Sequence, residues 1–136
     1  MKYLYVGLMA ILSITSCKEK EGNRDTELLE QYLQKQFNAG IAKDNSTYIL
    51  LADQACSGCA RYIFREAKVS HDKFIFILPR PSDNYIYNHS NVLIDSSANL
   101  GRLKFHRGNV CTIKTHDGLV TEVRVYDPSE VKDIFK

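Results

Sequence analysis

The sequence predicts one α/β domain built on a mixed sheet of four or five strands with flanking helices. Two short apolar runs, TYILLAD at 47–53 and KFIFILP at 73–79, are typical of strands that are buried on both faces. A segment with helical spacing lies between them, and this order predicts a parallel βαβ unit with a right-handed crossover. Two later strand-like runs are joined by Asp-Gly, which predicts an antiparallel hairpin and therefore a mixed sheet.

The first element of the domain is an amphipathic helix, predicted from Thr26 to about Lys43. Its apolar positions recur at helical spacing: Leu28, Leu29, Tyr32, Leu33 and Phe37. Asp25 or Thr26 can cap its start, and Gly40 can end it. The helix therefore precedes the strand at 47–53 and has one apolar face to bury.

The middle of the chain supplies a second helix and a third strand. The helix is predicted at about 58–68, directly after the first strand. Prolines at 79 and 81 indicate a loop, the segment 82–90 predicts one or two irregular helical turns, and NVLID at 91–95 predicts a strand. The residues at 96–109 carry no clear pattern, and no element is assigned to them.

The last third of the chain is predicted to form the hairpin and a closing helix. VCTIKTH at 110–116 and LVTEVRVY at 119–126 are joined by Asp117-Gly118, and a two-residue turn places His116 opposite Leu119. Their polar and β-branched residues are typical of strands near the edge of a sheet. A short helix is predicted from Asp127 to about Phe135, with a proline in its first turn.

The N-terminus has the pattern of an export signal. The apolar stretch at 4–14 is too short to span a membrane and fits the core of a signal peptide. It ends in Ile14-Thr15-Ser16-Cys17, which resembles the lipobox of bacterial lipoproteins. The resemblance implies cleavage after residue 16, acylation of Cys17 and attachment to a membrane through the lipid. An ordinary cleaved signal with a cysteine nearby is the alternative.

This reading divides the chain into a signal peptide at 1–16, a lipid-attached flexible tether at 17–25 and a domain at 26–136. The tether is charged and lacks apolar spacing. Lys18 stands where an acidic residue often marks inner-membrane retention, so the resemblance favours the outer membrane, facing the periplasm. The expected location is the bacterial cell envelope.

The charge and composition of the chain indicate no particular class of binding partner. The formal net charge is +2, and no patch of Lys and Arg with interleaved aromatic residues indicates nucleic-acid binding. No cofactor is predicted. The four cysteines carry more information, because the envelope is oxidising and disulfides persist there. Acylation of Cys17 leaves three, so at least one of these is unpaired within the chain, metal-bound or available to another protein.

The order of elements, with Cys56-Ser57-Gly58-Cys59 at a strand-to-helix junction, resembles the thioredoxin fold. NVLIDSS at 91–97 is similar to the extra strand of membrane-anchored thiol-disulfide oxidoreductases, and the likeness covers roughly 26–136. The resemblance implies a three-layer sandwich in which Cys56 is the nucleophilic thiol and Cys59 resolves the mixed disulfide. Protein thiols or disulfides of the envelope would be its partners.

The physical chemistry of helix termini supports the same roles for Cys56 and Cys59. A cysteine just before a helix lies where unpaired amides and the helix dipole favour the thiolate, and Cys59 is one turn further on. A purely structural disulfide is the alternative, although so small a ring stabilises little. Family members usually carry a cis-proline at the start of the hairpin strand, where this sequence has Asn109-Val110.

Two further hypotheses remain open. Soft thiolates suit monovalent copper or zinc, and Cys56, Cys59 and Cys111 with His106 or His116 would supply four ligands. CSGCARYIFREA at 56–67 also resembles the metal-binding segment of small heavy-metal-associated domains. Alternatively, Cys111 is a small buried residue, and the domain is a thioredoxin-like scaffold without chemistry.

Overall fold

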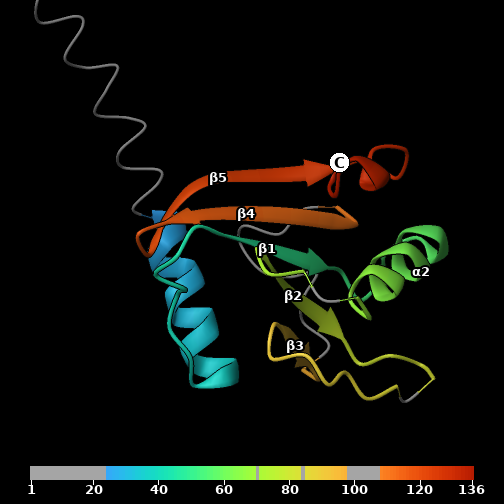
Figure 1. The fold of residues 1–136 in the computed structure, drawn as a ribbon, viewed down its shortest axis with the longest axis horizontal. Helices are drawn as coiled ribbons and strands as arrows, with labels where there is room; N and C mark the ends of the chain where they lie inside the picture. Colours follow the sequence, from blue (N-terminus) through green and yellow to red (C-terminus); the bar gives the residue numbers. More distant parts are fainter. Residues whose placement is uncertain (1–23, 70, 84, 98–107) are drawn as a thin grey trace, which may run out of the picture.

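A computed structural model of the protein describes residues 24–69, 71–83, 85–97 and 108–136. Within these ranges, five strands form one sheet in the order β3-β2-β1-β4-β5 (Figure 1). The elements are a helix at 24–37, β1 (Ser46–Leu51), α2 (Ser57–Glu66), β2 (Phe74–Pro79), β3 (Val92–Asp95), β4 (Val110–His116), β5 (Leu119–Tyr126) and the 3-10 helix η2 (Val131–Asp133). Residues 1–23, with the predicted signal peptide and Cys17, lie outside the described residues.

The sheet is mixed, as predicted. β1, β2 and β3 are parallel neighbours, whereas β4 pairs antiparallel with both β1 and β5. The hairpin has the predicted register, with His116 opposite Leu119. Asp117 and Gly118 both have positive φ, at 51° and 77°, as the two central residues of a type I′ turn require.

Alternating side chains divide the core into two clusters, one on each face of the sheet. Tyr48 and Leu50 of β1 face the N-terminal helix, whereas Ile49 and Leu51 face α2. The first cluster also contains Leu29, Leu33, Ile77, Cys111 and Ile113. The second also contains Cys59, Ile63, Phe76, Leu78, Val110 and Val131. Helices therefore cover both faces of the sheet, and this arrangement is consistent with a thioredoxin-like sandwich.

The N-terminal helix differs from its prediction at both boundaries. Residues 24 and 25, assigned to the flexible tether, are already helical, and the helix ends at residue 37 rather than near Lys43. Asn38 has a φ of +51°, and its N–H donates to the carbonyl of Gln34 at 3.1 Å. A left-handed asparagine ends a helix as a glycine does, so the chain turns before Gly40.

Two short predicted helices take other forms. The described residues of 82–90 contain no helical turn, because the Asp83 carboxylate accepts from the N–H of Tyr85 at 3.2 Å and holds a local turn there. The closing helix is reduced to the single turn η2. Phe135 instead stacks on Phe76 with ring centroids 6.1 Å apart, which anchors the C-terminus on the α2 side of the sheet.

Candidate functional site

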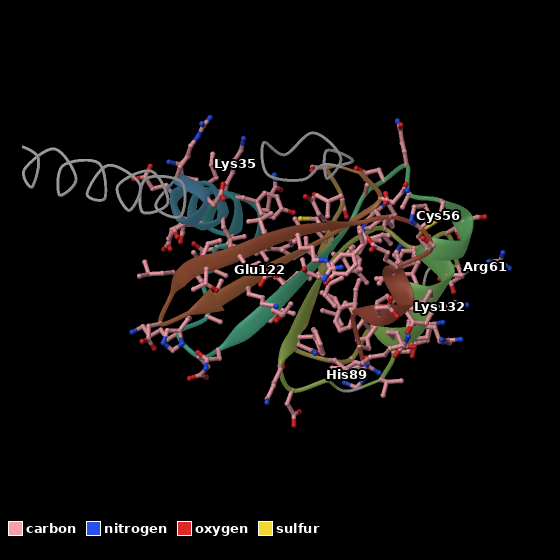
Figure 2. All side chains as sticks on the ribbon, turned by 90° about the horizontal axis from the view of Figure 1, so that it is seen from above. Lys35, Cys56, Arg61, His89, Glu122 and Lys132 are labelled. Carbon is pink, nitrogen blue, oxygen red and sulfur yellow. A yellow bond between two sulfur atoms is a disulfide. The ribbon has the colours of Figure 1, made fainter. Side chains whose placement is uncertain are left out.

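Cys56 and Cys59 lie where β1 passes into α2, as the sequence predicted. Cys56 is the N-cap residue of α2, and Cys59 lies in its first turn. The two sulfur atoms form a disulfide of 2.05 Å, with the Cα atoms 5.2 Å apart. Figure 2 shows Cys56 at the beginning of this helix. The site therefore occupies the carboxyl end of a central strand, where α/β proteins commonly place reactive groups.

The two sulfur atoms differ in their exposure to solvent. Cys56 is half-buried, whereas Cys59 is only 3% exposed and packs in the core cluster on the α2 side. The N–H of Cys59 donates to the sulfur of Cys56 at 3.1 Å, and the first turn of α2 contains no acidic residue. A reagent or substrate approaching from solvent therefore meets Cys56 first, next to a hydrogen-bond donor and the positive end of a helix.

Asn109 directly precedes β4, at the position where the resemblance to the thioredoxin fold led us to look for a cis-proline. No peptide bond between described residues is cis. The carbonyl of Asn109 accepts from the N–H of Ala52 at 3.0 Å, and its side-chain Oδ1 accepts from the N–H of Cys56 at 3.2 Å. The sequence does not predict these contacts. The one available signal was a polar residue directly before a buried strand.

A hollow of about 330 Å³ opens beside the disulfide, at the carboxyl ends of β1, β2 and β3. Ala55 and Ala60, the chain neighbours of the two cysteines, line it together with Phe64, Arg80 and Asp95. It offers an apolar wall from α2 and polar groups from the strand ends. Neither cysteine lines the hollow, but the residues next to them in the chain do, so a concave surface with room for part of a substrate lies near Cys56.

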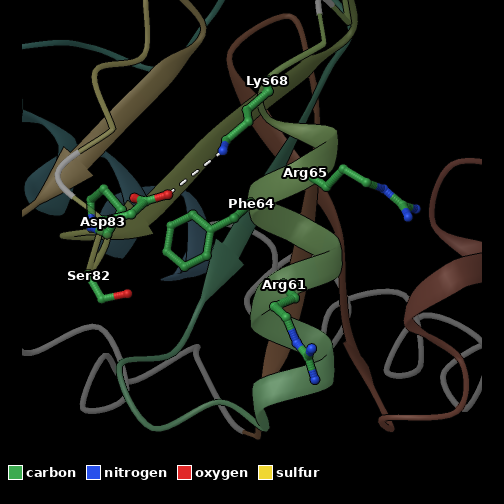
Figure 3. Close-up of a pocket in the computed structure, with 7 residues that line it drawn as sticks. Arg61, Phe64, Arg65, Lys68, Ser82 and Asp83 are labelled. Atoms are coloured by element: carbon green, nitrogen blue, oxygen red, sulfur yellow. Dashed lines mark ion pairs between the residues drawn. The ribbon is translucent and has the colours of Figure 1, made fainter.

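A second hollow, of about 240 Å³, continues along α2 and shares Phe64 and Ser82 with the first. Figure 3 shows Phe64 and Lys68 directed toward the loop that carries Ser82 and Asp83, whereas Arg65 points away from it. The Lys68 ammonium lies 3.8 Å from the Asp83 carboxylate. The two hollows together form a depression that follows the helix away from the disulfide.

Cys111 does not belong to this site, which overturns the hypothesis that groups it with Cys56 and Cys59 and agrees with the alternative of a small buried residue. It pairs with Leu50 across β1 and β4, and both side chains face the N-terminal helix rather than α2. Cys111 is fully buried, and burial raises the pKa of its thiol to about 12. The sheet therefore separates a protonated thiol from the disulfide.

The four-ligand metal set is overturned by the same geometry. His116 ends β4, beside Asn45 and next to the start of β1, whereas Cys56 follows the end of β1. His106 lies outside the described residues. Among the described residues, no group of three or more His, Cys, Asp or Glu side chains could hold a metal ion. Any metal at Cys56 and Cys59 would therefore have to bind without Cys111.

The sequence matches no family model, no curated protein and no solved structure. The assignment of the fold therefore rests on the sheet topology, the helices on both faces and the position of the cysteine pair. Over the ranges that the structure describes, no helix is sufficiently long and apolar to span a membrane.

Proposed function

We propose that the protein exchanges dithiol and disulfide with protein partners through Cys56 and Cys59. The observation that carries this proposal is a disulfide between a half-buried N-cap cysteine and a buried cysteine one turn later. A disulfide that only stabilised the fold would need neither this position nor the neighbouring hollow. The closed ring contains so few residues that its entropic contribution to stability is small.

The exchange begins with the reduced protein. The helix dipole and the N–H of Cys59 favour the thiolate of Cys56, which attacks one sulfur of a partner disulfide. A bond forms between Cys56 and that sulfur, the partner disulfide breaks, and the other partner sulfur leaves as a thiolate that takes up a proton.

The second step regenerates a disulfide in the protein. The thiolate of Cys59 attacks the sulfur of Cys56, the mixed disulfide breaks, and the second partner thiol is released. Two electrons pass from the protein to the partner, and the two protons lost by Cys56 and Cys59 are balanced by those gained by the partner. Burial of Cys59 restricts its attack to the adjacent Cys56 sulfur.

The proposal includes a location in the bacterial cell envelope, with attachment through an acylated Cys17. The support is the resemblance of residues 14–17 to a lipobox. Thr26, close to the start of the described chain, accepts from the N–H of Val120 at 2.9 Å, next to the hairpin turn. A tether from Cys17 would therefore join the domain at the end of the sheet opposite Cys56, which leaves the disulfide open to partners in the periplasm.

Intact mass and metal content of the purified full-length protein test the proposed activity. The protein is equilibrated in glutathione buffers of increasing reducing strength, its thiols are blocked with N-ethylmaleimide, and its mass is measured. We expect a reversible transition in which the reduced form carries two more blocking groups than the oxidised form. Stoichiometric copper or zinc on the reduced protein would favour the metal-binding alternative. If the protein showed neither a reversible transition nor bound metal, the third hypothesis, a thioredoxin-like scaffold without chemistry, would be favoured.

A further inference from the structure

Asn109 fixes both ends of the loop that carries Cys56. Its carbonyl accepts a hydrogen bond of 3.0 Å from the N–H of Ala52, the residue that directly follows β1. Its side-chain Oδ1 accepts from the N–H of Cys56, which precedes α2, at 3.2 Å. One residue, 53 positions away from Cys56 in the sequence, thus ties the strand end and the helix start to the beginning of β4.

The position of Asn109 is itself fixed by its neighbours. Gly108 has a φ of +86°, and a Cβ atom at that position would lie 2.9 Å from Cγ1 of Val125. Val110 is fully buried and pairs with Leu51 of β1. Asn109 therefore lies between a glycine that passes close to Val125 and a buried residue of β4, and its side chain reaches Cys56 from the start of that strand.

We infer that Asn109 is a positioning residue for the nucleophilic sulfur of Cys56, an inference that rests on the proposed thiol-disulfide exchange. With its N–H bound to Asn109, Cys56 keeps the N-cap conformation in which its sulfur accepts from the N–H of Cys59 at 3.1 Å. The same N–H stabilises a thiolate formed at Cys56 after reduction. Asn109 also provides the acceptor without a negative charge, which would oppose the thiolate.

The test compares Asn109→Ala with Asn109→Asp in the reduced full-length protein. Alkylation of Cys56 is followed against pH by site-resolved mass spectrometry. Asn109→Ala removes the hydrogen-bond acceptor. We therefore expect the pH midpoint of Cys56 alkylation to rise and the alkylation rate at neutral pH to fall about threefold to tenfold. Asn109→Asp keeps an acceptor of the same shape but adds a charge. The pH midpoint of Cys56 alkylation should also rise in Asn109→Asp. High salt should reduce the rise in Asn109→Asp but not the rise in Asn109→Ala, because salt screens the added charge.

Asn91→Ala is the matched control. The side-chain amide of Asn91 donates to the carbonyls of His71 and Phe74 at 3.1 and 2.9 Å, so it also ties a loop to a strand. Its removal should lower the melting temperature without moving the pH profile of Cys56. Equal shifts in the Asn91 and Asn109 variants, or no shift in either Asn109 variant, would overturn the positioning role.

Exchange of the wild-type protein with oxidised glutathione separates the two proposals. If the wild type does not exchange, the proposed function fails. If it exchanges normally and both Asn109 variants keep its pH profile and its equilibrium with glutathione, only the role of Asn109 fails. Since Asn109→Asp preserves the shape of the side chain, it gives a result even where Asn109→Ala does not fold.

Discussion

The hydroxyl of Tyr32 donates a hydrogen bond of 2.6 Å to the carboxylate of Asp95, 63 positions further along the chain. Tyr32 lies on the N-terminal helix, and Asp95 is the last residue of β3 and only 3% exposed. This bond ties the helix to the strand end that lines the hollow beside the disulfide. The Asp95 carboxylate also accepts from the N–H of Ser97 at 2.8 Å, which helps to compensate a buried charge.

Tyr32→Phe should destabilise the protein by about 2 kcal/mol at neutral pH, because it removes a hydrogen bond to a buried carboxylate. Burial raises the pKa of Asp95, but hydrogen bonds from Ser97 and Tyr32 outweigh it and lower the pKa overall. This stabilisation is therefore present above the unfolded pKa of ~3.9 and is lost as the pH falls through the lower folded pKa. Urea unfolding from pH 7 to pH 3 should show the difference from wild type shrinking in acid.

Tyr62→Phe is the matched control for that measurement. The Tyr62 hydroxyl is exposed and donates to the carbonyl of Lys132 at 3.5 Å, so its loss should change stability by less than about 0.5 kcal/mol. Burial and Asp95 raise the folded pKa of Tyr32, so its contribution is fully present below the unfolded pKa of ~10 and declines as the pH rises from there toward the higher folded pKa. A Tyr32→Phe penalty that is constant from pH 7 to pH 3 would contradict this account.

Cys111→Ala should leave thiol-disulfide exchange within twofold of wild type while lowering stability by roughly 1 to 2 kcal/mol, because it removes a buried sulfur from the core. Wild-type Cys111 should resist alkylation in the folded protein, since its thiol is buried and its pKa is raised to about 12. Labelling with and without urea, resolved by residue, measures both effects. Thiol-disulfide exchange that is tenfold slower in Cys111→Ala than in wild type would show that Cys111 takes part in the exchange.

Gly108→Ala should cost more stability than Gly118→Ala, although both glycines have a positive φ. At Gly118 a Cβ would meet no atom of the described residues within 4 Å, so the expected cost of ~1 kcal/mol reflects the left-handed backbone alone. At Gly108 the Cβ would also meet Val125, which adds about 1 to 3 kcal/mol of steric strain.

Val125→Ala provides the control for the steric part, because Val125 is 41% exposed and its own truncation should cost little. In the double variant with Gly108→Ala, the penalty should fall to that of Gly118→Ala when measured by chemical unfolding. Equal losses of stability in Gly108→Ala and Gly118→Ala would show that the Val125 side chain moves aside without strain. Gly108 would then matter for its backbone conformation only.

The parts of the structure that were predictable are set by local patterns. The Asp117-Gly118 turn fixes the two pairs next to it, before a bulge between Lys114 and Thr115 shifts the register of the hairpin by one residue. Apolar runs at 47–53 and 73–79 locate two parallel strands within one or two residues of their observed bounds. The cysteine pair was placed at a strand-to-helix junction for the same reason. Each of these inferences needed only a few consecutive residues.

The parts that were missed depend on distant contacts. The metal hypothesis grouped Cys111 with Cys56 and Cys59. The face of the sheet on which Cys111 lies follows from its pairing with Leu50, which no local pattern encodes. The contact between Asn109 and Cys56 spans 53 positions. Asn38 ended the first helix before Gly40, because asparagine can also adopt the left-handed conformation.

Cys17→Ala should abolish acylation and cleavage at this site, if residues 14–17 act as a lipobox as we propose. Metabolic labelling with a fatty acid, followed by separation of membranes from the soluble fraction, measures both consequences. Wild-type protein should carry label and sediment with membranes, and the variant should be unlabelled and of higher mass. Ser16→Ala is the control, since a small residue before the cysteine is retained. Normal processing of Cys17→Ala, with a fully soluble wild type, would contradict the lipid anchor.

Cys59→Ser should trap partner proteins, because Cys56 can still attack a disulfide while no second thiol resolves the mixed disulfide. Complexes that disappear on reduction should accumulate in cells and be visible by non-reducing electrophoresis. Cys56→Ser should trap nothing, since the remaining Cys59 is only 3% exposed. If Cys56→Ser trapped as much as Cys59→Ser, the assignment of nucleophile and resolving thiol would be reversed. If neither trapped and both lost bound metal, Cys56 and Cys59 would be metal ligands instead.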